Sequence, residues 1–422
     1  MSDIQDQLAE LRKRIAKIDR KYAAPDSAAP APSPRAPRPD KYFVEEWLNG
    51  REVETDHGRH YEIDKLFERH RRHGSVGIQD LEGLPCDLLH PISNGQIQSV
   101  PPRKWAFLDT ETTGLAGGAG TYAFLIGVGS ITEKGFLVRQ FFMREFAEET
   151  SLLLALSDYL KNFDVLITYN GKTYDQPLLE TRYRMARTRP PFAAVEHLDL
   201  LFGARRLWKL RFDSCRLVDL ENQILGVERQ GDLPGEMIPY VYFEYLRTRE
   251  AFKLVPILHH NQIDILTLAC LTAIVPWAFH DPEKARFSHG ADMVGLARWW
   301  RQAENLENAL GLFRQAVRRS LPEELLARTL WDIAALEKKL GREVAALPVL
   351  TELAGYCNPF RGAALEELAK YYERRERNYA LALEMTRAAL GYRQGHESSE
   401  ALQRRAARLE KKLAGPKLQR LL

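Results

Sequence analysis

Two carboxylates stand at the end of an apolar run, in Trp-Ala-Phe-Leu-Asp-Thr-Glu-Thr-Thr-Gly over residues 105–114. If the run is a β-strand, alternate side chains share a face, so Asp109 and Glu111 project to the same side. Two neighbouring carboxylates in an apolar setting are costly unless cations pair with them. A hard dication with oxygen ligands satisfies both, so this spacing favours metal-dependent chemistry. The alternative is a carboxylate pair in a solvated turn.

A further acid, Asp175, lies in Tyr-Asn-Gly-Lys-Thr-Tyr-Asp-Gln-Pro-Leu-Leu over residues 169–179. Aspartate is a preferred helix cap and Pro177 fits a first helical turn, so capping alone would explain it. Asp175 can cap the helix and also belong to a functional site, because functional sites in open α/β sheets lie where strands end. Neighbouring groups are then candidates for contacts with a substrate, and the lysine is a candidate phosphate contact. These candidates are Asn170 and Lys172 in this loop, and Thr112, Thr113, Gly114 and Leu115 in the turn after the first acids.

The last acid, Asp264, interrupts an apolar helix that the sequence predicts from Pro256 onward, in His-His-Asn-Gln-Ile-Asp over residues 259–264. A carboxylate on such a face requires a partner. His260 lies one turn before Asp264 on the same face, whereas His259 is rotated away. A pair of surface histidines on a helix is the alternative interpretation. If one of them serves a site, we favour His260 and keep His259 as the second candidate.

The segments around these acids alternate between strand and helix patterns. Three apolar runs separated by turn signals predict a meander, and two further strands alternate with helices. This order predicts an α/β fold with a mixed sheet flanked by helices. The predicted strands end at Asp109 or span 121–131, 135–143, 164–169 and 197–200; the predicted helices span 150–160 and 176–186, and 201–280 is mainly helical with a break at 231–235.

The three acidic segments, in this order, resemble the DEDD superfamily of ribonuclease-H-like exonucleases, and the His-Asn-x-x-Asp ending resembles its YprB-type bacterial subgroup. The resemblance covers residues 103–280. It implies that two divalent ions, Mg²⁺ or Mn²⁺, are bound by four acids: Asp109, Glu111, Asp175 and Asp264. It also implies that His260 or His259 orients or deprotonates the attacking water. The expected activity is two-metal hydrolysis of nucleic acid from single-stranded 3′ ends.

Five regions are predicted along the chain. Ala-Leu pairs recur, as at Ala309 and Ala346, and paired helices at that period are typical of a tetratricopeptide-like repeat, with an unrelated helical bundle as the alternative. The repeats and an amphipathic N-terminal helix are candidate surfaces for a protein partner. The regions are the amphipathic helix 1–22, a Pro/Ala-rich linker 23–40, a weakly patterned lead-in 41–102, the ribonuclease-H-like domain 103–285 and the helical repeats 293–415.

Composition limits the class of protein but does not identify its binding partner. A hydrophobic share of 45% is sufficient for the cores of two or three domains, and the net charge of +3 leaves nucleic-acid binding to local patches. Four cysteines without a CxxC pair argue against a disulfide framework. No apolar run approaches a bilayer span, so we expect a cytoplasmic protein without a membrane partner. We expect the lead-in histidines to be exposed: His57, His60, His70, His73 and His90.

Two other functions use the same features. An inactive nuclease fold could act as a scaffold that binds proteins through the repeats, although a decayed site usually loses an acid and all four are present. A structure-selective endonuclease would share every metal ligand and differ in how its substrate groove is closed. The lengths of products from end-labelled substrates separate the exonuclease from the endonuclease.

Overall fold

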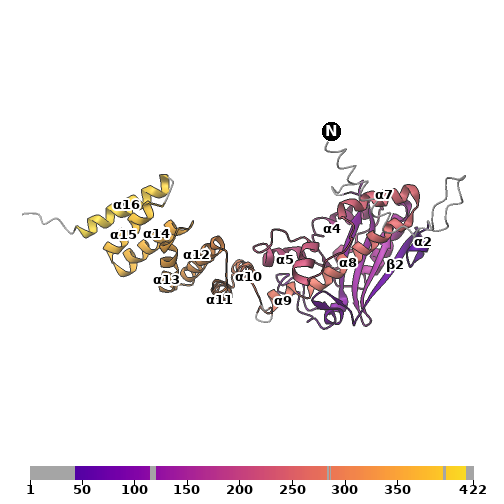
Figure 1. Cartoon of the computed structure of the whole chain (residues 1–422), viewed down its shortest axis with the longest axis horizontal. Helices are drawn as coiled ribbons and strands as arrows, with labels where there is room; N and C mark the ends of the chain where they lie inside the picture. Colours follow the sequence, from indigo (N-terminus) through magenta and orange to yellow (C-terminus); the bar gives the residue numbers. More distant parts are fainter. Residues whose placement is uncertain (1–42, 115–119, 283–284, 286, 393–395, 415–422) are drawn as a thin grey trace, which may run out of the picture. The chain divides into compact units, whose positions relative to one another are not determined.

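A computed structural model of the chain describes residues 43–114, 120–282, 285, 287–392 and 396–414, without the side chains of 396–399. The predicted N-terminal helix and linker, 1–22 and 23–40, lie outside the described residues. The chain divides into two compact units, one formed by 1–205 with 214–285 and the other by 206–213 with 286–422 (Figure 1). All the predicted site residues belong to the first unit.

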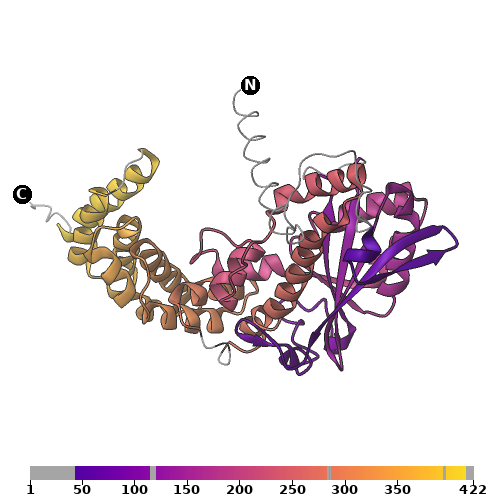
Figure 2. The same ribbon diagram turned by 45° about the vertical axis from the view of Figure 1, so that its right-hand side comes forward.

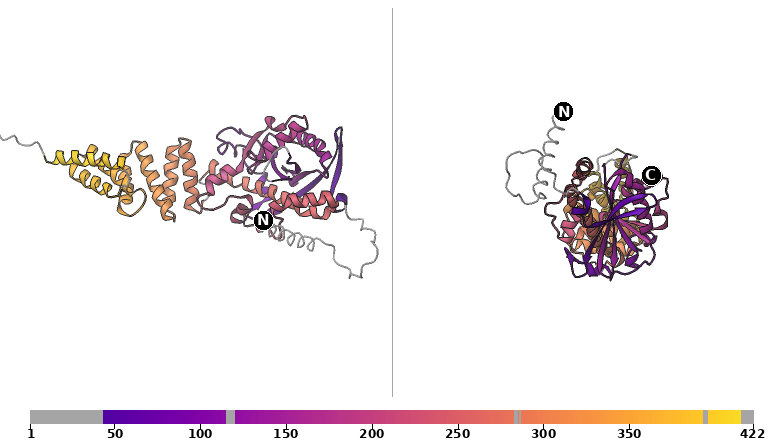
Figure 3. Two further views of the ribbon diagram at one scale, coloured as in Figure 1. Left: turned by 90° about the horizontal axis from the view of Figure 1, so that it is seen from above. Right: turned by 90° about the vertical axis from the view of Figure 1, so that its right-hand side faces the viewer.

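A seven-stranded mixed sheet forms the centre of the first unit, in the order β1-β2-β7-β6-β5-β8-β9 (Figure 2). Strand β5 pairs with β6 antiparallel and with β8 parallel, and β8 pairs with β9 parallel. The strands twist along the sheet, as the right-hand view of Figure 3 shows. They are β1 (Gly50–Thr55), β2 (Gly58–Glu68), β5 (Trp105–Thr112), β6 (Ala123–Thr132), β7 (Gly135–Phe142), β8 (Val165–Thr168) and β9 (Glu196–Asp199).

The lead-in segment contributes two strands to this sheet. Strand β2 pairs antiparallel with β7 from Tyr61 to Glu68, so the sheet begins well before residue 103. A separate ribbon of β3 (Arg72–His73) and β4 (Val76–Gly77) follows. The expectation of exposed lead-in histidines is wrong for His60 and His73, which are both buried. Each is buried because it has polar partners: His60 bonds to Ser151, and His73 bonds to Thr267.

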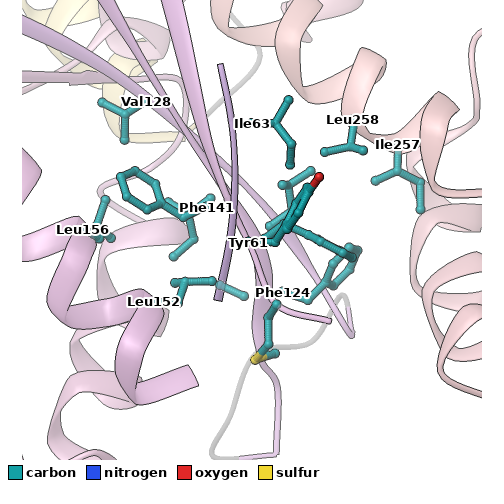
Figure 4. Close-up of a cluster of buried hydrophobic side chains, with 14 of the residues drawn as sticks. Tyr61, Ile63, Phe124, Val128, Phe141, Leu152, Leu156, Ile257 and Leu258 are labelled. Carbon is teal, nitrogen blue, oxygen red and sulfur yellow. The ribbon is translucent and has the colours of Figure 1, made fainter. Parts of the chain in front are cut away.

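Helices cover both faces of the sheet. On one face Leu152 and Leu156 of α3 (Glu149–Leu160) pack against Phe141, and on the other Ile257 and Leu258 of α8 (Val255–Thr272) approach the sheet (Figure 4). Helix α4 joins the α3 face, because Tyr183 donates a hydrogen bond to the backbone of α3. The remaining helices of this unit are α2 (Val44–Trp47), α4 (Asp175–Met185), α6 (Leu217–Leu220), α7 (Ile238–Thr248) and α9 (Val275–His280), with α5 (Leu200–Trp208) crossing the division between the units.

Helix α8 lies directly on the sheet because β6 carries two glycines where it crosses. A Cβ at Gly127 would lie 2.2 Å from Asn261 Oδ1, and one at Gly129 would lie 2.5 Å from Ile265. An 18-residue window within residues 251–280 reaches a mean hydropathy of 1.6, enough for a membrane span by composition and length, but 67% of that window is buried inside the structure. Burial on both sides explains the apolar composition of this central helix.

The second unit is all-helical, and its consecutive helices pack against each other. Small buried alanines allow the close packing: Ala309, Ala346 and Ala382 are all buried. The helices are α10 (Gly290–Gln302), α11 (Leu306–Val317), α12 (Glu323–Lys339), α13 (Glu343–Gly355), α14 (Arg361–Tyr371), α15 (Tyr379–Leu390) and α16 (His396–Leu413).

Candidate active site

The first two acids lie at the end of β5, next to a break in its pairing. Asp109 and Glu111 alternate with Thr110, so they share the face of the sheet on which α8 packs. The register with β6 shifts between Glu111 and Thr112, as in a β-bulge. Bulges occur frequently beside active sites because they redirect side chains at the end of a strand.

A buried amide relay holds Asp109 from the α8 side. Asn261 donates from Nδ2 to Asp109 Oδ2 (2.8 Å), and its Oδ1 accepts a hydrogen bond from Gln140 (2.8 Å). Gln140 in turn accepts from Gln262 (2.7 Å). Because Gln140 occupies the Asn261 oxygen, the Asn261 amide must point its NH₂ group at the carboxylate. The asparagine of the His-Asn-x-x-Asp segment is therefore part of the site.

Asp175 is the first residue of α4, and Tyr174 occupies the cap position without a side-chain cap bond. Instead of capping the helix, the buried carboxylate accepts a hydrogen bond from Thr110 Oγ1 at 2.5 Å. The contact joins α4 to β5, because Thr110 points to the opposite face from Asp109 and Glu111. It brings the third acid to the end of the strand that carries the first two.

Asp264 is held by a guanidinium that no local sequence motif marks. Arg229 Nη2 lies 2.5 Å from Asp264 Oδ1, while Nε lies 2.5 Å from the buried Glu221 and Nη1 lies 3.1 Å from Asp232. The arginine side chain is only 9% exposed. Three carboxylates around one buried cation form a charge network that fixes the side of α8 facing the site.

The structure separates the two candidate histidines. His260 Nδ1 lies 2.9 Å from Asp232, and its Nε2 lies 3.5 Å from Asp264. With the proton on Nδ1 donated to Asp232, the Nε2 lone pair faces the acids. His259 lines a neighbouring cavity of about 340 Å³, together with residues 227–233. The structure therefore places His260, and not His259, in the wall beside the acids.

One cavity of about 290 Å³ joins these elements. Three of the four acids line it, and Asp175 lies beside it, close enough for its charge to act on Asp109 and Glu111. The bulge residues, the start of α7 and the α8 histidine complete the walls. Its lining consists of Asp109, Thr110, Glu111, Thr112, Tyr174, Gly235, Ile238, Pro239, His260 and Asp264.

Three acids in and beside this cavity, Asp109, Glu111 and Asp175, resist ionisation. Burial, followed by the charges of Asp264 and Asp175, raises the pKa of Asp109 well above its ordinary range. Burial and the charge of Asp109 do the same to the pKa of Glu111. Burial lowers the pKa of His260, but the bond to Asp232 and the charge of Asp264 outweigh it, so that this pKa is raised. Excess negative charge is concentrated here.

The donor set fits divalent cations, which would relieve this repulsion with oxygen ligands. Within the described part of the chain, no three His, Cys, Asp or Glu side chains already form a set that could hold an ion. The reason lies in their present partners: Asn261 bonds to Asp109, Thr110 to Asp175 and Arg229 to Asp264. Metal binding would therefore require side-chain shifts that release the acids from these partners.

The predicted substrate contacts lie on two loops near the acids. The Thr112 hydroxyl donates to the Gly114 carbonyl, and the Thr113 hydroxyl accepts from the Tyr122 backbone, so both stabilise the turn. Leu115 lies outside the described residues. The backbone amides of Asn170 and Lys172 both donate to the buried Asp199, which leaves their side chains exposed outside the cavity lining.

Comparisons with known proteins agree with this architecture. Residues 106–275 match the model of the RNase H superfamily. YprB of Bacillus subtilis (strain 168), itself uncharacterized, is 33% identical over 352 residues, which cover 81% of this chain and 83% of that protein. The chain belongs to the YprB family. The YprB match covers twice as much of the chain as the superfamily match, so the relationship extends well beyond the sheet domain.

A family B DNA polymerase from the hyperthermophilic archaeon Pyrobaculum calidifontis also aligns with this YprB-family chain. The alignment covers 85% of this chain and 56% of the polymerase chain, with 13% identity and a TM-score of 0.33. A TM-score of that size does not establish a shared fold.

The acid cluster predicts an unusual pH dependence of stability for this YprB-family protein. Burial raises the pKa of Asp175 to about 6, from 3.8. The folded state therefore binds more protons than the unfolded state between these values, so stability falls as pH rises from 3.8 to about 6 and stays lower above it. Asp175→Asn should remove a penalty of at most ~3 kcal/mol, at ~1.4 kcal/mol per pKa unit.

Thermal unfolding of the metal-free protein at pH 4 and pH 7 checks this. The asparagine variant should be more stable than the wild type at pH 7 and close to it at pH 4, where the aspartate is largely protonated. An equal difference at both pH values would show that the substitution acts through packing or the Thr110 bond instead.

Proposed function

We propose that this chain is a metal-dependent 3′-to-5′ exonuclease acting on nucleic acid. The observation that carries the proposal is the convergence of Asp109, Glu111 and Asp264 in one cavity, with Asp175 beside it and His260 in its wall. These residues come from β5, α4 and α8, and specific protein contacts support Asp109, Asp175, Asp264 and His260. A cluster of acids with raised pKa values is typical of a site built for cations and for chemistry on a phosphate ester.

The four acids would hold two divalent ions, Mg²⁺ or Mn²⁺. Bound ions supply the positive charge that admits a polyanion, activates water and stabilises the leaving oxygen. The protein contributes the arrangement of the ligands: Asn261 orients Asp109, Thr110 orients Asp175 and Arg229 orients Asp264. Each orienting group lies on a strand or helix of the described core, or in the charge network beside it.

His260 would accept the proton of the attacking water at Nε2. The hydrogen bond from Nδ1 to Asp232 fixes the ring and the tautomer, as a second carboxylate does for many catalytic histidines. Asp232 is thus a positioning residue, outside the cavity lining and in contact with the base. The site combines a carboxylate–histidine pair with the metal-ligand cluster.

Asp232→Asn should lower kcat by roughly 10–100-fold with little change in KM, the usual cost of losing a partner that orients a site residue. The asparagine keeps the size of the side chain but can offer its NH₂ group to His260, which favours the wrong tautomer. Steady-state kinetics with Glu228→Gln, an exposed acid of the same segment, provides the control. A full kcat in Asp232→Asn would mean that His260 needs no such support.

End-labelled substrates test the proposed activity directly. Single- and double-stranded DNA and RNA, each labelled at the 5′ end, are incubated with the full-length protein and Mg²⁺ or Mn²⁺. A ladder that shortens from the 3′ end supports the proposal. Internal fragments would assign an endonuclease, and intact substrates under every condition would leave the scaffold function.

The helical second unit fits a supporting role in this proposal. Its paired helices and buried alanines are those expected of a tetratricopeptide-like repeat, which typically binds a protein partner. We extend the proposal to a cytoplasmic nuclease that is brought to its substrate through this unit.

A further inference from the structure

Helix α7 carries an exposed aromatic stripe. Tyr240 and Phe243 are 55% and 47% exposed, and the Arg247 side chain is 77% exposed. Their spacings of three and four residues place them along one face of the helix. We call Tyr240, Phe243 and Arg247 the α7 stripe. Large aromatic side chains on a solvent-facing surface indicate a binding role when they cluster beside a site.

The opposite face of α7 is firmly anchored, so the stripe is presented on a fixed element. Val241, Tyr242 and Tyr245 are buried, and the Tyr242 ring stacks on Phe124 with centroids 3.8 Å apart. The Tyr242 hydroxyl also donates to the backbone carbonyl of Met143. A rigid aromatic surface binds with a smaller loss of conformational entropy than a mobile loop.

The α7 stripe begins at the wall of the candidate active site. Ile238 and Pro239, in the first turn of α7, line the cavity that holds Asp109, Glu111 and Asp264. Tyr240 is the next residue along the chain. At 1.5 Å per residue, the stripe runs ~10 Å from Tyr240 to Arg247, leading away from the cavity.

We propose that the α7 stripe binds the single-stranded nucleotides that adjoin the 3′ end held in the cavity. Unpaired bases stack on exposed aromatic rings, and a guanidinium at the end of the track contacts phosphate. A duplex keeps its base faces stacked inside the helix and cannot use such a surface in the same way. The proposal rests on the proposed function, because it takes the cavity as the place of cleavage. It assigns residues outside the cavity to the binding of the expected single-stranded substrate, DNA or RNA.

Binding measurements test the α7 stripe separately from catalysis. The full-length protein is titrated against a labelled single strand of about 12 nucleotides, near the site sizes of known single-strand binders. An Asp109→Asn background keeps the strand intact. Tyr240→Ser with Phe243→Ser should weaken binding about 30-fold or more, given the usual contribution of two stacked bases. Arg247→Gln should weaken it less and reduce its salt dependence.

Phe202→Ser is the matched control, because Phe202 is an aromatic residue of similar exposure on α5, outside the stripe. It should bind the strand as the background protein does. Unchanged affinity in the Tyr240/Phe243 double variant, with circular dichroism showing an intact fold, would overturn the proposal even if the surface contacts a protein. Failure of the wild type to hydrolyse any strand would instead overturn the proposed function, whatever the binding results.

Discussion

Replacing Asp109 with asparagine should lower metal-dependent phosphodiester hydrolysis on the order of 10⁴-fold, the scale on which hydrolases lose activity when one core group is removed. Asparagine has nearly the same size and keeps an oxygen that can accept the Asn261 hydrogen bond. It cannot supply the negative charge that a divalent ion needs. Because ionising Asp109 is unfavourable in the metal-free fold, the variant should be at least as stable as the wild type at pH 7.

Two measurements make this expectation specific. Calorimetric titration with Mn²⁺ should show weaker or absent binding in Asp109→Asn. Asp56→Asn, which removes an exposed carboxylate from the β1–β2 turn, should leave both metal binding and hydrolysis unchanged. Undiminished cleavage by a purified, folded Asp109→Asn protein would falsify the assignment of the active site.

The two adjacent histidines should respond very differently to substitution. His260→Ala is expected to reduce kcat by ~10²–10⁴-fold, the usual contribution of a general base. His259→Ala should change kcat only slightly, because His259 faces the neighbouring cavity. This difference between the two variants also decides between His260 and His259 as the candidate base, a choice that the sequence leaves open. Single-turnover kinetics on one labelled strand measures both variants under identical conditions.

The histidine comparison has its own internal control. Each variant removes one imidazole from the same turn of α8, so effects on helix stability should be similar in both. A loss of activity confined to His259→Ala would reverse the assignment. Equal losses in both variants, accompanied by equal losses of thermal stability, would indicate damage to α8 instead of loss of a base.

The sequence predicts the α/β fold class, and the structure confirms it, because the β5, β6 and β7 segments have strong local signals. Apolar runs and turns define these strands without information from distant residues. The sequence does not predict that the lead-in, 41–102, belongs to the sheet. Strand β2 alternates weakly, and its position depends on pairing with β7, which is more than sixty residues further along the chain.

The site shows the same division between local and long-range information. The four acids and His260 stand in short motifs, and one helical spacing was sufficient to rank His260 above His259. Asp232 lies in the predicted Gly/Pro-rich break at 231–235 and Arg229 lies just before it, so no local motif marks either residue. Their function depends on meeting α8 in three dimensions. An unpaired acid on an apolar helix was the only signal that a cation should approach Asp264.

His60 and His73 show that the composition of a segment does not predict which of its polar residues are buried. Both occur in a polar lead-in, but each meets a hydrogen-bonding partner from a helix distant in the chain: Ser151 for His60 and Thr267 for His73. A polar side chain can be buried when such a partner exists. The partner's position follows from the tertiary fold and cannot be read from residues 41–102.

The two glycines of β6 give this fold a vulnerable point beside the candidate site, where Gly127 pairs with Asp109 across the two strands. A methyl group at Gly127 would collide with the asparagine that orients Asp109 and with Ile265 of the same helix. Strand β6 carries none of the four acids. The missing side chain at Gly127 nevertheless lets α8 approach the sheet, and so affects the distance between the acids of β5 and α8. Among random variants, Gly127→Ala should therefore lose activity, as variants of the proposed site residues should. In this fold, the space left by a missing side chain limits which mutations are tolerated, as the chemistry of the site residues does.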